Sequence, residues 1–227
     1  MAEFKLARRP RQLELPPAKT WGGARRGAGR PAGPRPAVPH IARPDHARRH
    51  PVHVTIRAQR ALPSLRAAQP FAAIRAAIAV ASNDRFRVVH FSVQGDHLHA
   101  IVEADDKKSL SLGIAALKVR AARAVNRTLG RHGPVWSGKY HARALRTPRE
   151  TRNALLYVIQ NWKKHIRGAR GIDGRSSGPW FDGWTKSSVA PPMPSPVAPA
   201  RTWLASKGWR ERGGGPLGHH ETPAAAG

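Results

Sequence analysis

The sequence predicts an α+β fold: a ferredoxin-like βαββαβ antiparallel sheet, one additional C-terminal helix, and disordered basic tails on either side. Short β-branched runs and longer stretches of helical apolar spacing follow one another in the order β-α-β-β-α-β, which is typical of the split βαβ arrangement. A three-residue turn joins two of the strands, as in a hairpin, and a last helical stretch follows the final strand.

Arg, Pro and Gly dominate both ends of the chain, which sets the predicted domain boundaries. Residues 1–49 lack apolar periodicity and bury too little apolar surface to offset chain entropy, so we expect a disordered basic arm. Residues 50–168 are predicted to form the folded domain. Residues 169–227 are again rich in Gly, Pro and Ser but contain four tryptophans, which predicts a partly ordered tail.

The first half of the domain contains three predicted strands and one helix. Residues 53–56 are β-branched and lie between prolines, which predicts a strand. Residues 71–82 are Ala-rich with helical spacing, and Asn83 ends this helix. Residues 86–93 and 97–103 are two strands joined by the turn at 94–96.

The second half contains two helices and one strand. Residues 109–129 predict a long amphipathic helix with Ser109 as its N-cap and Gly130 as its end. Residues 135–145 are strand-like but interrupted by Gly138. Residues 148–166 predict a last helix that begins at Pro148 with Thr147 as its cap.

The charge balance predicts a polyanionic partner. Forty Lys and Arg outweigh thirteen Asp and Glu, which gives a formal net charge of +27 and favours nucleic acid. The absence of cysteine excludes disulfides, thiolate metal sites and thiol nucleophiles. No apolar run approaches the roughly 18 residues of a membrane span, and the N-terminus lacks the apolar core of a signal peptide. We therefore expect a cytoplasmic protein with no membrane partner.

Two histidines on one predicted strand form a candidate metal site. His97 and His99 are two residues apart, so both side chains leave the same face of the sheet, while Leu98 faces the core. Paired imidazoles on a sheet surface suit a metal ion or an electrostatic contact with phosphate.

The last predicted helix carries a second group of polar residues. Tyr157 and Asn161 lie one turn apart on the same helix face. A tyrosine on such a helix is most often a packed aromatic. This one is followed by an amide that would complete a metal shell, either Asn161 or its neighbour Gln160.

These residues resemble the single-tyrosine HUH transposases, above all the REP-associated tyrosine transposases. The resemblance rests on Gly-Asp-His-Leu-His at 95–99 and Tyr-Val-Ile-Gln-Asn at 157–161, and it covers roughly residues 50–166. The strands at 53–55 and 136–140 fall where that family places its outer strands. The resemblance implies that the additional C-terminal helix is catalytic.

The resemblance also implies a chemistry and a partner. Tyr157 would attack a phosphodiester of single-stranded DNA, in a hairpin or palindromic repeat, and form a covalent 5′-phosphotyrosine that a second strand end can reverse. His97, His99 and Asn161 would hold a divalent metal, Mg²⁺ or Mn²⁺, and this nitrogen-rich set suits Mn²⁺ better. The protein would act as a monomer or a homodimer.

Further candidates surround this constellation. Tyr140 is the alternative nucleophile, although a packed or base-stacking aromatic is the favoured interpretation. Asp96 and Glu103 flank the histidines and would orient the imidazoles if they act as outer-shell carboxylates. The candidates for DNA contact are basic residues on the long helix, the last strand and the last helix: Arg120, Arg123, Arg127, Arg143, Arg146 and Lys163.

Three other functions fit parts of the pattern. A catalytically silent DNA- or RNA-binding protein would share the fold and the charge. An RNA-recognition sheet would display aromatic residues on its central strands, where this chain has Phe91 and two histidines. A metallohydrolase that uses His97 and His99 would normally add a carboxylate ligand. We therefore predict DNA cleavage and strand transfer over these alternatives.

Overall fold

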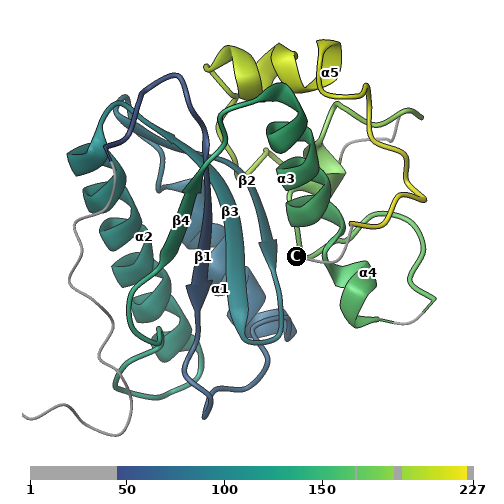
Figure 1. Ribbon diagram of the computed structural model, residues 1–227. Coiled ribbons are helices and arrows are strands. Elements are labelled where there is room, and N and C mark those ends of the chain that lie inside the picture. The colour runs from purple at the N-terminus through teal and green to yellow at the C-terminus, as the bar shows by residue number, and fades with distance from the viewer. Residues whose placement is uncertain (1–44, 167, 187–190, 224–227) are drawn as a thin grey trace, which may run out of the picture. The chain divides into compact units, whose positions relative to one another are not determined.

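Four strands form one antiparallel sheet in the order β2-β3-β1-β4, which confirms the predicted ferredoxin-like arrangement. The computed structural model describes residues 45–166, 168–186 and 191–223 (Figure 1). The strands are β1 (Val52–Arg57), β2 (Phe86–Val93), β3 (His97–Ala104) and β4 (His141–Ala144). The helices are α1 (Ala68–Ala79), α2 (Lys107–Thr128), α3 (Pro148–Gln160), α4 (Trp162–His165) and α5 (Trp209–Glu211).

The helices cover the two faces of the sheet unequally, as Figure 1 shows. Helices α1 and α2 pack on one face, where alternate strand residues such as Val54, Leu98 and Phe91 form the larger hydrophobic cluster. Helix α3 and the C-terminal segment cover the other face, where Ile101 is the strand residue of a second cluster. The sheet therefore separates an α1–α2 core from an α3 core.

A β-bulge keeps β2 in phase with the α1–α2 core. Val88 pairs with Val102 whereas His90 pairs with Ile101, so Val89 is the extra residue of the bulge. Without it, strict alternation would turn Phe91 away from the cluster that holds Val88. The bulge instead places His90 on the α3 side, beside Ser177 and Phe181.

Several predicted boundaries are wrong in detail. Helix α2 begins at Lys107 because Asp106, rather than Ser109, is its cap and accepts a hydrogen bond from the Ser109 backbone. Helix α1 begins at Ala68 and ends at Ala79, before the predicted end at residue 82. The predicted strand at 135–145 is reduced to β4, with an isolated bridge between Trp136 and Ala58.

The arrangement also corrects two longer-range expectations. Strand β1, predicted as an outer strand, lies between β3 and β4 inside the sheet, and the outer strands are β2 and β4. The predicted helix at 148–166 is interrupted at Asn161, where α3 gives way to α4. The Thr147 cap is confirmed, since its side chain accepts from the Glu150 backbone.

The ends of the predicted domain make specific contacts with it. Residues 1–44 of the predicted arm lie outside the described residues, but His46 bonds to the Ala104 carbonyl and Arg48 pairs with Asp105 at 3.1 Å. In the C-terminal segment Phe181, Trp184, Trp209 and Leu217 are buried in the α3 core. These residues of the predicted tail therefore pack as part of the same domain.

No helix among the described residues is long and apolar enough to cross a membrane.

Gly113 marks a close approach between α2 and β2, and its substitution gives a first prediction. A Cβ at this buried position would overlap the Phe86 ring. We expect Gly113→Ala to destabilise the fold by about 1–3 kcal/mol through overpacking, despite the better helix propensity of alanine. Urea denaturation of the two proteins measures the difference. Phe86→Leu in the Gly113→Ala background should recover part of the loss, and an unchanged or raised stability of Gly113→Ala would contradict the close packing.

Candidate active site

The two predicted histidines lie side by side at the start of β3. His97 and His99 face the α3 side of the sheet, and their ring centroids are 4.5 Å apart. Leu98 between them is buried in the α1–α2 core, as predicted. The strand period therefore places both imidazoles on one face.

In both His97 and His99, a neighbouring side chain lies within hydrogen-bonding distance of Nδ1. His97 Nδ1 donates to Asp96 Oδ1 at 2.6 Å, and this bond holds the pKa of Asp96 below its usual value. His99 Nδ1 lies 3.0 Å from Thr55 Oγ1 on β1. In the tautomer with the proton on Nδ1, each ring presents Nε2 as its ligand atom.

Burial keeps the inner imidazoles neutral. Burial, followed by the neighbouring charge of His97, lowers the pKa of His99 to about 2. Burial also lowers the pKa of His53, whose ring centroid is 5.3 Å from that of His99, to about 4. A neutral imidazole is the form that binds metals, so His99 and His53 are in that form near pH 7.

Helix α3 places Tyr157 over the histidines. The Tyr157 ring lies edge-on to His99 at 5.1 Å and to His53 at 5.6 Å between centroids. Lys164 Nζ stands 5.0 Å from the centre of the Tyr157 ring. A phenol, three imidazoles and an ammonium group therefore meet at one place, although they come from β1, β3, α3 and α4.

Asn161 and Gln160 differ sharply in their surroundings. Both side chains are buried, yet Gln160 accepts from Trp162 Nε1 and donates to the His219 carbonyl. Asn161 Oδ1 and Nδ2 have no hydrogen-bond partner among the described residues. A buried amide with both polar atoms unpaired is costly unless a ligand satisfies it. Of the two amides, Asn161 is the better candidate ligand.

The residues fit a metal ion only if an amide is included. His99 Nε2 is likewise buried without a partner among the described residues. No group of three or more His, Cys, Asp or Glu side chains in the described part of the chain is arranged to hold a metal. The unpaired ligand atoms among the described residues of this region are one imidazole nitrogen, that of His99, and the amide of Asn161.

Tyr140 lies away from this cluster. It is partly buried and packs against the α1–α2 core, on the other side of the sheet from Tyr157. This placement agrees with the packed aromatic that the sequence favoured.

The predicted DNA-contact residues fall into separate groups. Arg143 on β4 pairs with His53 across the sheet register, so it shares the face of the histidines, and it forms an exposed ion pair with Glu150 at 3.5 Å. Arg146 is exposed just before α3. The remaining arginines are exposed on α2, in the layer opposite α3: Arg120, Arg123 and Arg127. Of these five arginines, Arg143 and Arg146 lie closest to the tyrosine helix along the chain.

Lys163 forms hydrogen bonds with the C-terminal segment. Its Nζ donates to the carbonyls of His219 and Glu221, and burial lowers its pKa. At the other end of α3, Arg152 donates to the carbonyls of Gly215 and Pro216 and pairs with Glu221 at 3.0 Å. The segment 215–221 therefore fastens both ends of the tyrosine helix, which the sequence did not indicate.

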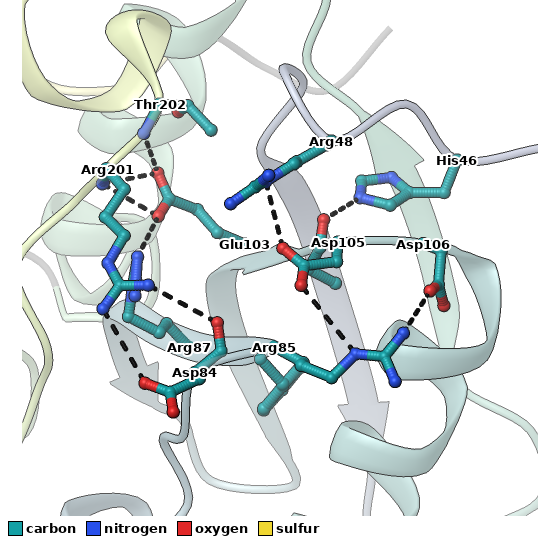
Figure 2. Close-up of polar contacts among 12 residues, drawn as sticks. His46, Arg48, Asp84, Arg85, Arg87, Glu103, Asp105, Asp106, Arg201 and Thr202 are labelled. Carbon is teal, nitrogen blue, oxygen red and sulfur yellow. Dashed lines mark hydrogen bonds and ion pairs between the residues drawn. The ribbon is translucent and has the colours of Figure 1, made fainter.

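The carboxylate of Glu103 binds the C-terminal segment and not the histidines. Figure 2 shows its carboxylate accepting from the backbone nitrogens of Arg201 and Thr202, at 2.8–3.1 Å. Arg87 lies 3.5 Å from the same carboxylate, and both side chains are buried. Of the two predicted orienting carboxylates, Asp96 contacts a histidine and Glu103 instead anchors the start of the last helical segment.

Sequence reasoning missed His53 and Thr55 as members of the site. Thr55 stands opposite His99 in the register between β1 and β3, and His53 opposite Ile101. The signal was present, because the polar residues of 52–57 alternate with Val52, Val54 and Ile56. This alternation indicates site residues only once the strand pairing is known, because that pairing places β1 beside β3.

His90 gives a prediction for pH. Burial lowers its pKa from 6.5 to about 4 in the folded chain, where Nδ1 lies 3.2 Å from Ser177 Oγ. As pH falls below 6.5, the unfolded chain gains a proton that the folded chain does not, so stability falls until about pH 4. His90 alone should remove about 2 kcal/mol between pH 7 and pH 5.

Urea denaturation at the two pH values measures this loss. His90→Asn keeps a polar atom for Ser177 and should show a smaller loss between pH 7 and pH 5 than the original chain. Equal losses in the two proteins would mean that His90 is not the titrating group.

Comparisons with known proteins add to this geometry. Residues 50–161 match the family model described as "Transposase IS200 like". A solved structure titled "Structure of the REP associates tyrosine transposase bound to a REP hairpin" aligns with a TM-score of 0.47 and 19% identity, over 56% of this chain and 74% of that one. No curated protein matches.

Proposed function

Residues 50–161 belong to the IS200-like transposase family, whose members act in DNA transposition, and from this premise we propose that the chain cleaves and rejoins single-stranded DNA through Tyr157. The observation that carries the proposal is the edge-on packing of the Tyr157 ring against His99, 5.1 Å away, with His97 beside it. A nucleophile candidate and two ligand candidates thus meet from sequence positions far apart.

The proposed step conserves the phosphodiester energy. Tyr157 Oη attacks the phosphorus, the bond to the 3′ oxygen breaks, and the phenolic proton passes through solvent to the departing 3′-hydroxyl. The product is a 5′-phosphotyrosine, which a second 3′-hydroxyl reverses to join a different strand. No nucleotide cofactor is required, because each step exchanges one phosphoester for another.

The residues around Tyr157 support a divalent metal, Mg²⁺ or Mn²⁺, held by His97, His99 and Asn161. Such an ion, when bound, polarises the scissile phosphate and offsets its developing charge. With Asp96 and Thr55 accepting from the two Nδ1 atoms, both Nε2 atoms would be left to bind the ion. Lys164, whose Nζ lies 5.0 Å from the centre of the Tyr157 ring, adds positive charge beside the candidate nucleophile, where a phosphate would lie.

The substrate class follows from charge and from the resemblance to tyrosine transposases. A formal charge of +27 favours a polyanion, and exposed Arg143 and Arg146 flank the entry to α3. We take the substrate to be single-stranded DNA that contains a hairpin or palindromic repeat, with those arginines on its phosphates.

The test is a covalent adduct. Hairpin-containing single strands with a label on either side of each candidate cut are incubated with Mn²⁺ and separated on a denaturing gel. We expect the label on the 3′ side of the cut to move with the protein, and His97→Ala and His99→Ala to reduce the adduct at least about a hundredfold. DNA binding without any adduct across varied hairpins would make the chain a silent DNA-binding protein.

A further inference from the structure

A cavity of about 280 Å³ lies beside the histidine pair, and most of the residues that line it have no part in the proposed chemistry. It is bordered by the turn before β3, by Arg66, and by Trp162, His165 and Ile166 at the end of the tyrosine helix region. His97 belongs both to this cavity and to the candidate active site. The volume lies just below the roughly 300–1,000 Å³ of pockets for drug-sized ligands, which suits one flat ring system.

The walls of the cavity offer planar and apolar surfaces. Trp162 is half-buried, and its Nε1 donates to Gln160 Oε1 at 3.3 Å, which restrains the indole. The rings of His97 and His165 lie 6.2 Å apart between centroids. Ile166 is 45% exposed, which is high for a large aliphatic side chain inside a folded domain. Aromatic planes of this kind are the surfaces on which unpaired bases stack.

Two restrained polar side chains complete the cavity. Arg66 is held by both oxygens of Asp173, at 2.8 and 2.9 Å, and by the Val93 carbonyl. Gln94 is 2% exposed and donates from Nε2 to Ser92 Oγ at 2.6 Å, while no described residue donates to its Oε1. A fixed cation and a fixed amide give a base edge a hydrogen-bonding partner that needs no rearrangement.

We propose that this cavity binds one unpaired nucleobase of the single-stranded DNA, stacked on Trp162 and contacted at its edge by Gln94. Because His97 borders the cavity, the base belongs to a nucleotide next to the phosphate that faces Tyr157. The cavity then selects which phosphate is cut. This inference rests on the proposed function for its substrate class.

The experiment measures binding in EDTA, so that it is independent of metal and of adduct formation. Single strands that differ by one abasic position are titrated against the full chain. One position should cost about 5- to 150-fold in affinity, as expected for the loss of one stacked base. In Trp162→Ala this penalty should disappear, whereas Trp162→Phe should retain part of it and the control Trp203→Ala, at another half-exposed tryptophan, should retain it fully.

A second measurement distinguishes stacking of a base on Trp162 from a purely structural role of this side chain. 2-Aminopurine at the penalised position should be quenched on binding to the original chain and remain bright with Trp162→Ala. Strands that bind with no abasic penalty, or a penalty that persists in Trp162→Ala, would overturn the proposal. A loss of affinity at one abasic position, without any Mn²⁺-dependent adduct, would support the base site and contradict the proposed cleavage.

Discussion

Tyr157→Phe is expected to abolish covalent attachment to single-stranded DNA, lowering the adduct at least about a thousandfold, as removal of a nucleophile does in other covalent enzymes. The fold should be retained, because the phenol hydroxyl makes no hydrogen bond to any described residue and the ring contacts with His53 and His99 remain. The adduct is measured on a denaturing gel, and thermal unfolding confirms that the variant is folded.

Tyr140→Phe provides the matched control, since the chain has only two tyrosines. Tyr140 packs against the α1–α2 core, so its variant should form the adduct at close to the original rate. An adduct that survives Tyr157→Phe and is lost in Tyr140→Phe would transfer the nucleophile to Tyr140. Loss of DNA binding in Tyr157→Phe would show instead that the ring environment, and not the hydroxyl, had changed.

The central fold was predictable because its signals are local. The hairpin of β2 and β3, the long α2 and the Thr147 cap of α3 each follow from neighbouring residues. The interruption at Asn161 was not predictable from spacing, since Asn161 keeps helical backbone angles. The residues on either side of it, Gln160 and Lys163, both donate to the carbonyl of His219, more than 50 positions later, and no local pattern indicates these contacts.

The packing of the C-terminal segment also depends on residues that are distant in the sequence, so it could not be predicted from local patterns. Its Gly and Pro residues conceal any periodicity, yet Trp184 and Trp209 are buried against Phe181 in the α3 core. Burial of single aromatics from irregular backbone depends on the surface that receives them, and that surface exists only after α3 has packed on the sheet. Tyr157, His97 and His99 were identifiable from strand and helix periods, whereas His53 and Thr55 required the β1–β3 register.

Glu103→Ala is expected to cause the largest loss of stability, about 3–5 kcal/mol, because it leaves the buried guanidinium of Arg87 without its counter-charge. The same substitution removes the acceptor of two backbone N–H groups, those of Arg201 and Thr202 (Figure 2). Glu103→Gln keeps one oxygen for these donors but not the charge, so its loss should be smaller. Urea denaturation of the original chain, Glu103→Gln and Glu103→Ala measures their free energies of unfolding, which should decrease in that order.

A control in the same network separates buried from exposed charge. Asp84 lies 4.0 Å from the Arg201 guanidinium but is fully exposed, and Asp84→Asn should leave the unfolding midpoint unchanged. The carboxylate of Glu103 holds the start of the segment whose Trp209 packs in the α3 core, so its loss should also speed hydrogen exchange in 201–211 before it affects α1 and α2. Uniform exchange across both cores would mean that Glu103 stabilises the sheet alone, and equal losses in Glu103→Ala and Asp84→Asn would refute the buried ion pair as the source of the effect.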